Sequence, residues 1–154
     1  MFEPTRAGGL HRLAEFAPKA GRAYQAGRNY DLSAGDRSVV SQLSPWLRHR
    51  LIAESEVLDI VLAHHAPDAA ASFVQEIFWR GYFKGWLEHR PSVWTAYRTG
   101  LKQAQIAPPS GYDQAIAGNT GIACFDHWNT ELRRSGYLHN HARMWFASIW
   151  IFTL

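Results

Sequence analysis

Cysteine is almost absent from this chain, because Cys124 is the single one among 154 residues. One thiol excludes an internal disulfide and any metal site built from several cysteines, and it fits a reducing cytoplasm. No apolar stretch reaches the roughly 20 residues that a membrane-crossing helix needs. The first residues also lack the apolar segment typical of a secretion signal. We therefore expect a cytoplasmic protein with no membrane partner.

Strand patterns are missing as well. No segment alternates Val, Ile or Thr with polar residues over several positions, as a half-buried strand would. Apolar residues recur instead three and four positions apart, which is typical of amphipathic helices. The sequence predicts an all-α fold, an orthogonal multi-helix cluster of about six to eight helices in a single domain. The expected helices cover residues 3–28 with Thr5 as the N-cap and a break at Pro18, then 53–65, 68–89, 93–104 and 125–135, and a last one from Asn140 onward.

Charge of one sign does not dominate. The chain has 16 Lys and Arg against 13 Asp and Glu, so its net charge is +3 with neutral histidines. This mildly basic balance permits an anionic partner without requiring one. Aromatic residues are frequent instead, with seven Trp. Trp rings often line cofactor pockets or interfaces, although ordinary core packing accounts for most of them.

A loop followed by a helix start is expected around Ser44. Residues 29–42 are rich in loop formers, and the next segment places Ser44 before Pro45. Serine is a common N-cap, and proline suits the first position of a helix. The hydroxyls of Ser41 and Ser44, together with free N–H groups at a helix start, would form an anion site. The alternative is an ordinary serine cap with no ligand.

The longest predicted helix carries charged and aromatic residues on one face. Glu76, Trp79, Arg80 and Phe83 are spaced so that they share this face. The spacing from Glu76 to Arg80 suits an ion pair. A solvated salt bridge worth a few tenths of a kcal/mol is the simpler interpretation. Aromatic residues on both sides of the helix favour a pair that borders a cleft.

The last predicted helix begins with polar residues and continues almost wholly apolar. Gly136 would close the preceding helix in a left-handed conformation, and Asn140 would cap the new one. Asn140 and Arg143, three positions apart, share a face and would be polar groups held inside the protein. An ordinary cap and a surface arginine are the alternative. A second stripe is expected to be buried, formed by Met144, Ala147, Ser148 and Ile151.

Three segments of the chain resemble one known family. Residues 41–47 read Ser-Gln-Leu-Ser-Pro-Trp-Leu, and residues 76–83 read Glu-Ile-Phe-Trp-Arg-Gly-Tyr-Phe. The third runs from Gly-Asn-Thr-Gly at residues 118–121 to His-Asn-His-Ala-Arg-Met at residues 139–144. In this order they are similar to the flavin-binding helical domain of the DNA photolyase/cryptochrome family. The resemblance covers roughly residues 24–154 and implies a buried FAD.

The resemblance assigns one group of residues to the phosphates of FAD. Tyr24 and Arg28 match the residues that precede the family's phosphate loop. Ser41, Leu43 and Ser44 match the loop itself. This agrees with the anion site that the residues predict on their own.

A second group matches positions around the flavin ring and the damaged DNA. Glu76 and Trp79 match residues that meet a flipped-out pyrimidine dimer, and Asn140 matches a residue between flavin and lesion. Arg80 and Arg143 match flavin-side positions. The implied catalytic residues are thus Glu76, Trp79 and Asn140. The implied reaction is light-driven electron transfer from reduced flavin to a pyrimidine dimer in DNA.

The chain also departs from the family pattern. Val40 stands where the family usually has Thr, and His141 replaces an Arg to which the resemblance assigns a DNA-phosphate contact. The family's amino-terminal antenna-binding α/β domain and its segments beyond Leu154 have no counterpart. We therefore expect a domain truncated after Leu154. Two of the family's electron-relay tryptophans would lie in that missing part, so the seven Trp are not assigned as that relay.

Two other functions remain open. A cryptochrome-like flavin photosensor would signal without repair, and a helical fragment without flavin would only bind a partner. Glu76, Trp79 and Asn140 favour a DNA photolyase, because a sensor has no need of lesion contacts. No metal is expected, since His139 and His141 are two positions apart and no third ligand is evident. A monomer is the favoured state.

Overall fold

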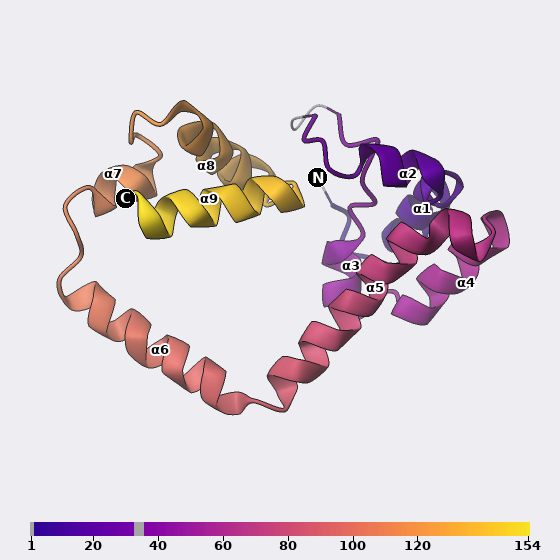
Figure 1. Cartoon of the computed structure of the whole chain (residues 1–154), viewed down its shortest axis with the longest axis horizontal. Helices are drawn as coiled ribbons and strands as arrows, with labels where there is room; N and C mark the ends of the chain where they lie inside the picture. The colour runs from indigo at the N-terminus through magenta and orange to yellow at the C-terminus, as the bar shows by residue number, and fades with distance from the viewer. Residues whose placement is uncertain (1, 33–35) are drawn as a thin grey trace. The chain divides into compact units, whose positions relative to one another are not determined.

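A computed structural model describes residues 2–32 and 36–154. These residues form helices, turns and loops and no strand, which confirms the predicted all-α class (Figure 1). The chain divides into two compact units, with the boundary between Gly85 and Trp86. Each unit is considered by itself below. The single domain and the orthogonal arrangement remain predictions.

The first unit contains five α-helices and a short 3-10 turn among the described residues. They are α1 Arg6–Phe16, η1 Ala17–Lys19, α2 Arg22–Gly27, α3 Ser44–Arg48, α4 Glu54–His64 and α5 Pro67–Glu88, whose last turn crosses the boundary. Two local predictions are confirmed. Thr5 caps α1 by accepting the N–H of Gly8, and α1 ends just before Pro18. The predicted loop at residues 29–42 includes residues 33–35, which lie outside the described part of the chain.

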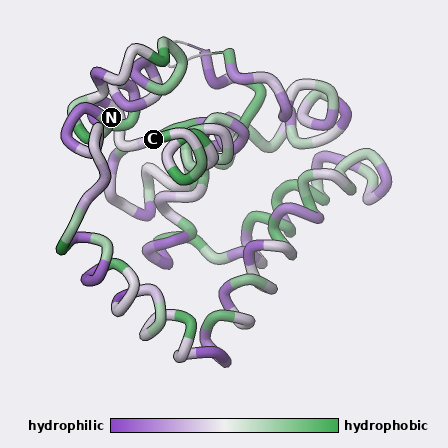
Figure 2. The backbone as a smooth tube through the Cα atoms, turned by 60° about the vertical axis from the view of Figure 1, so that its left-hand side comes forward, coloured by the Kyte–Doolittle hydropathy of each residue, from purple (hydrophilic) through white to green (hydrophobic). Residues whose placement is uncertain are grey.

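The core of the first unit forms where α1, α3, α4 and α5 place apolar residues at helical spacing. Figure 2 shows hydrophobic residues recurring between hydrophilic ones along the helices. Leu13, Phe16, Val57, Val61 and Phe73 are almost completely buried together. Removal of such side chains from water is the main favourable term of folding. This core supports the loop that precedes α3, because Leu43 at its end is also buried.

The second unit contains α6 Pro91–Ile106, α7 Tyr112–Ala117, α8 Ala123–Ser135 and α9 Asn140–Phe152 among its described residues. Gly136 ends α8 with a positive φ of 68°, as predicted. Phe125 of α8 is fully buried and stacks on Phe146 of α9, with ring centroids 4.4 Å apart. Trp150 lies against both rings. These aromatic contacts hold α8 and α9 together.

The predicted buried stripe of α9 is wrong. Met144 and Ile151 are 62% and 69% exposed, whereas Ala142, Phe146 and Trp150 face the unit's interior. The inward-facing residues recur every four positions, so the predicted stripe and the observed stripe both have helical spacing. Because α9 is apolar on almost every side, its periodicity does not select a face. The contact with Phe125 selects it.

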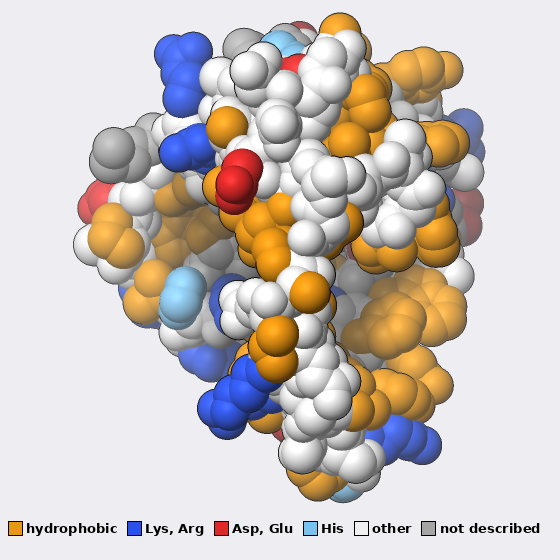
Figure 3. All heavy atoms as spheres, turned by 90° about the vertical axis from the view of Figure 1, so that its left-hand side faces the viewer, with side chains coloured by type: hydrophobic (Ala, Val, Ile, Leu, Met, Phe, Trp, Pro, Cys, Tyr) orange, Lys and Arg blue, Asp and Glu red, His pale blue; other side chains and the backbone are white. Residues whose placement is uncertain are grey.

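Apolar side chains remain exposed on several helices. In α6 no residue is buried, and Gly81 and Leu87 of α5 are exposed, whereas Phe73 and Ile77 earlier in α5 are buried. Figure 3 shows hydrophobic side chains over much of the face that it draws. Among the described residues, no helix combines the length and the apolar character needed to cross a bilayer.

Candidate functional site

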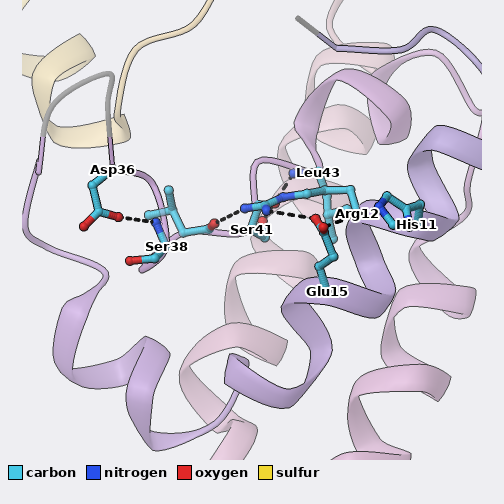
Figure 4. Close-up of polar contacts among 8 residues, drawn as sticks. His11, Arg12, Glu15, Asp36, Ser38, Ser41 and Leu43 are labelled. Atoms are coloured by element: carbon cyan, nitrogen blue, oxygen red, sulfur yellow. Dashed lines mark hydrogen bonds and ion pairs between the residues drawn. The ribbon is translucent and has the colours of Figure 1, made fainter.

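The loop before α3 is attached to α1 by one arginine. The Nε of Arg12 donates to the carbonyl oxygen of Ser41 at 2.9 Å, and its Nη2 donates to the carbonyl oxygen of Val40 at 3.1 Å (Figure 4). The Nη1 of the same guanidinium donates to the Oε2 of Glu15 at 3.4 Å. Charge-assisted bonds to backbone carbonyls hold a loop more firmly than neutral ones. Arg12 is not among the residues predicted from the sequence, because nothing in a lone arginine on an amphipathic helix indicates a distant loop partner.

A second anchor lies earlier in the same loop. The carboxylate of Asp36 accepts the N–H of Ser38 at 2.9 Å. The Ser38 side chain and N–H stabilise the charged form, so the pKa of Asp36 is lowered from its ordinary value. The hydroxyl of Ser41 accepts the N–H of Leu43 at 3.4 Å, around a Gln42 residue with a positive φ of 55°. The loop is therefore shaped by local polar contacts.

The predicted cap at Ser44 is wrong. The helix α3 starts at Ser44 itself, and its N-cap residue Leu43 makes no side-chain cap bond. The helix has five residues, so its dipole adds little to an anion site. The Ser44 hydroxyl has no hydrogen-bond partner among the described residues and stays available as a donor. Because the side chain of Leu43 is buried, any contact of Leu43 with a ligand would have to come from its backbone.

The predicted Glu76–Arg80 ion pair is also wrong. The Glu76 carboxylate pairs with Arg28, at the end of α2, and the Nε of Arg80 lies 3.3 Å from a carboxylate oxygen of Glu54. Each partner comes from another helix of the first unit. Tyr24 sits one turn before Arg28 with its ring edge-on to Phe73, the centroids 5.2 Å apart. The structure thus brings Tyr24, Arg28 and Glu76 into one region, through tertiary rather than local contacts.

Trp79 belongs to an exposed aromatic cluster on α5. Its ring stacks on Phe83 with centroids 5.6 Å apart, and Tyr82 contacts both rings edge-on. Trp79 is 46% exposed, so it presents ring surface to a partner. Planar aromatic surface of this kind suits stacking on a base or a heterocycle.

The start of α9 differs from the prediction. Asn140 is the first helical residue rather than the cap, and His139 takes the cap role, because its Nδ1 accepts the N–H of His141 at 3.2 Å. Arg143 donates from Nε and Nη2 to the carbonyl oxygen of Leu138, at 3.3 and 3.2 Å. Asn140 is exposed, and its amide has no hydrogen-bond partner among the described residues. Asn140 and Arg143 both lie in the first turn of α9, but both side chains are exposed, so the prediction that they are held inside the protein is wrong.

The turn before α8 is organised by one carboxylate. Asp126 accepts the N–H and the hydroxyl of Thr120, at 3.0 and 2.9 Å, and the N–H of Gly121 at 3.1 Å. These donors lower the pKa of Asp126 from its ordinary value, the Thr120 N–H most of all. Gly118, with a φ of 71°, packs against Asn129, whose amide donates to the carbonyl oxygens of Ala115 and Ile116. The turn joins α7 to α8 by polar contacts.

Comparison with known families decides the relationship of the chain. Residues 73–154, more than half of the chain, match the family described as the FAD binding domain of DNA photolyase. The chain belongs to this photolyase FAD-binding family. FAD is therefore its cofactor. No curated protein and no solved structure matches the chain.

The family match divides the predicted site residues of this FAD-binding domain into two groups. Glu76, Trp79, Arg80, Asn140 and Arg143 lie within the matched residues. The phosphate-side residues precede them, so their assignment depends on the motif resemblance alone; they are Tyr24, Arg28, Ser41, Leu43 and Ser44.

Side-chain polar groups that have no hydrogen-bond partner in the fold are a test of whether the residues present suit FAD. The Asn140 amide and the Ser44 hydroxyl have no hydrogen-bond partner among the described residues. The Nδ1 of His141 is buried and likewise lacks one. FAD has many hydrogen-bonding groups and two phosphates, and each unit taken by itself offers groups that suit them: Ser44 and Arg28 in the first unit, and Asn140, His141 and Arg143 in the second. Within the described ranges no group of three or more His, Cys, Asp or Glu is placed to hold a metal ion.

Proposed function

We propose that this FAD-binding domain serves a DNA photolyase, which repairs a pyrimidine dimer flipped out of DNA. The observation that carries the proposal is that the family match spans Glu76, Trp79 and Asn140. All three side chains are exposed. A base that leaves the stack needs an aromatic plane to lie on and polar groups to bond its edge, and these are the groups present.

On the cofactor side, each proposed residue offers a group that FAD requires. Arg28 and the hydroxyls of Ser41 and Ser44 bind the phosphates, with Tyr24 and the backbone of Leu43 beside them. In the matched segment, the guanidinium groups of Arg80 and Arg143 and the amide of Asn140 bind the ring system. The bound, reduced flavin supplies the light-driven electron, and the protein supplies binding and orientation.

On the lesion side, Trp79 and Glu76 have separate roles. The exposed face of Trp79 stacks on a flipped pyrimidine, supported from behind by Phe83. The Glu76 carboxylate accepts hydrogen bonds from the base edge, while its pairing with Arg28 keeps it oriented. Asn140, with its amide unused by the fold, donates and accepts toward the flavin and the lesion.

The first experiment measures flavin binding by the chain. The purified protein is incubated with FAD, passed through gel filtration, and examined by absorption and fluorescence. Co-eluting flavin supports the cofactor assignment, and the Ser44→Ala and Arg28→Met variants should release it more readily. Helical circular dichroism without flavin would mean that the residues present do not hold the cofactor by themselves.

The second experiment tests the DNA lesion as substrate. Dark binding of an oligonucleotide with one thymine dimer is followed by fluorescence anisotropy, and repair under blue light by loss of the dimer. Trp79→Ala should weaken binding by roughly 5- to 100-fold, the range expected for one stacked base. Trp94→Ala removes another exposed tryptophan, on α6, and should change nothing. Bound flavin without dimer binding would reject repair and favour a photosensor.

A further inference from the structure

The N-terminus of α9 is capped by an unusual residue. Ser, Thr, Asp and Asn are the preferred N-caps, and Asn140 is of this type. The cap is nevertheless His139, one position earlier, whose Nδ1 accepts the N–H of His141 at 3.2 Å. Asn140 thereby becomes the first residue inside the helix. The choice of cap therefore determines what the Asn140 side chain does.

A capping asparagine uses its side-chain oxygen on the backbone. In that arrangement the Asn140 amide would bond a free N–H of its own helix and would be only partly available to a ligand. With His139 as the cap, both the oxygen and the NH₂ group of Asn140 remain without partners among the described residues. The cap and the ligand contact are thus divided between two neighbouring side chains.

His139 is held firmly enough to set this register. It is 2% exposed, and its ring stacks on that of His141 with centroids 5.5 Å apart. The residue before it, Leu138, is fully buried, and its carbonyl oxygen accepts two bonds from Arg143. Ala142 is buried one turn later. Asn140 is therefore an exposed residue between fixed neighbours, which is how a site residue is kept in position.

The capping bond also specifies the chemical form of the ring. A nitrogen that accepts a hydrogen bond carries no proton, so His139 has its proton on Nε2 and is neutral. A neutral ring is also preferred at a helix N-terminus, where the macrodipole disfavours positive charge. Asparagine is the closest replacement, because its side-chain oxygen is an equally good cap acceptor. Leucine fills a similar volume without an acceptor.

We propose that His139 is a positioning residue for the flavin site: it caps α9 so that the amide of Asn140 is free to bind FAD. This inference rests on the role of Asn140 proposed above. His139 itself touches neither the cofactor nor the substrate. Its effect is transmitted through the register of the first turn of α9.

The cap is tested first without flavin, by amide hydrogen exchange followed by NMR. In the full chain, the N–H of His141 should exchange about fivefold or more faster in His139→Leu than in the wild type, as expected for loss of one N-cap. His139→Asn should restore protection of this amide. Unchanged exchange in His139→Leu, or no rescue in His139→Asn, would overturn the inference whether or not flavin binds.

The effect on the cofactor is tested with the FAD-loaded chain. The midpoint potential and the visible spectrum of bound FAD are measured for the wild type, His139→Leu, His139→Asn and Asn140→Ala. Replacement of His139 by Leu should shift both in the direction of Asn140→Ala, and His139→Asn should return them toward the wild type. A general loss of structure would not be rescued in this way.

The comparison separates the two proposals. If Asn140→Ala shifts the potential and His139→Leu does not, the positioning role of His139 is wrong and the proposed role of Asn140 stands. If Asn140→Ala leaves both the potential and the spectrum unchanged, Asn140 does not contact the flavin, and both proposals fail at this site.

Discussion

The Glu76 carboxylate on α5 is paired with the guanidinium of Arg28, which lies 48 positions earlier in the chain. One turn along α5, Arg80 is paired with Glu54 of α4. Glu76 and Arg80 have the spacing of an ion pair within one helix, yet each pairs with a residue from another helix. The consequence is that α5 is linked to α2 and α4 on the same face that carries Trp79.

The Arg28–Glu76 pair should contribute little to stability. Its side chains are 31% and 44% exposed, so water screens the attraction. A double-mutant cycle with Arg28→Met and Glu76→Gln, measured by urea unfolding, should give a coupling free energy below about 1 kcal/mol. The Glu54–Arg80 pair serves as the matched control and should behave similarly. A coupling energy well above this limit would mean that the pair supports the fold rather than serving a ligand.

Gly118 and Gly136 should respond differently to alanine. Both have a positive φ, which costs a residue with a Cβ roughly 1–2 kcal/mol. A Cβ on Gly118 would also lie 2.9 Å from the Asn129 side chain, whereas Gly136 faces open space. Gly118→Ala should therefore lower the free energy of unfolding by about 1 kcal/mol more than Gly136→Ala does. Equal losses in chemical denaturation would contradict the packing of Gly118 against Asn129.

Phe125 should be a major stabilising residue of the second unit. Its side chain is fully buried and stacks on Phe146. Phe125→Ala should lower the free energy of unfolding by about 3–5 kcal/mol, because it removes apolar contacts and leaves a cavity. Phe152→Ala, at a residue that is 82% exposed, should change it by less than about 0.5 kcal/mol. The ratio of the two losses checks which face of α9 is buried.

Glu56 should make stability depend on pH in the acid range. Its bonds from Arg6 and from the N–H of Ala53 lower its pKa from 4.5 to about 2. As the pH falls, the Glu56 carboxylate is protonated in the unfolded chain before it is protonated in the folded chain. The stabilising contribution of the ionised carboxylate is therefore fully present above pH 4.5 and is lost as the pH falls toward about 2. In Glu56→Gln the thermal midpoint should fall less steeply over this range. Arg6→Met should flatten the curve similarly, and an unchanged slope in both variants would contradict this origin.

Features that depend on neighbouring residues were predicted from the sequence. Thr5 capping α1, the break at Pro18 and the left-handed Gly136 each follow from the conformational preference of one residue. The 22-residue helix α5 follows from apolar spacing over its whole length. The three family motifs are likewise local strings of residues. They indicate the FAD-binding family without any information on tertiary contacts.

Only the tertiary structure decided which groups meet. The partners of Glu76 and Arg80 come from distant helices, and spacing within α5 carries no information on them. The same holds for Arg12, whose loop partners lie 28 and 29 positions away. The buried face of α9 depends on its contact with Phe125. The cap at His139 depends on the burial of the His139 ring. Short-range preferences determine where helices begin and end, whereas packing among distant residues determines which side chains are consumed by the fold and which remain for a ligand.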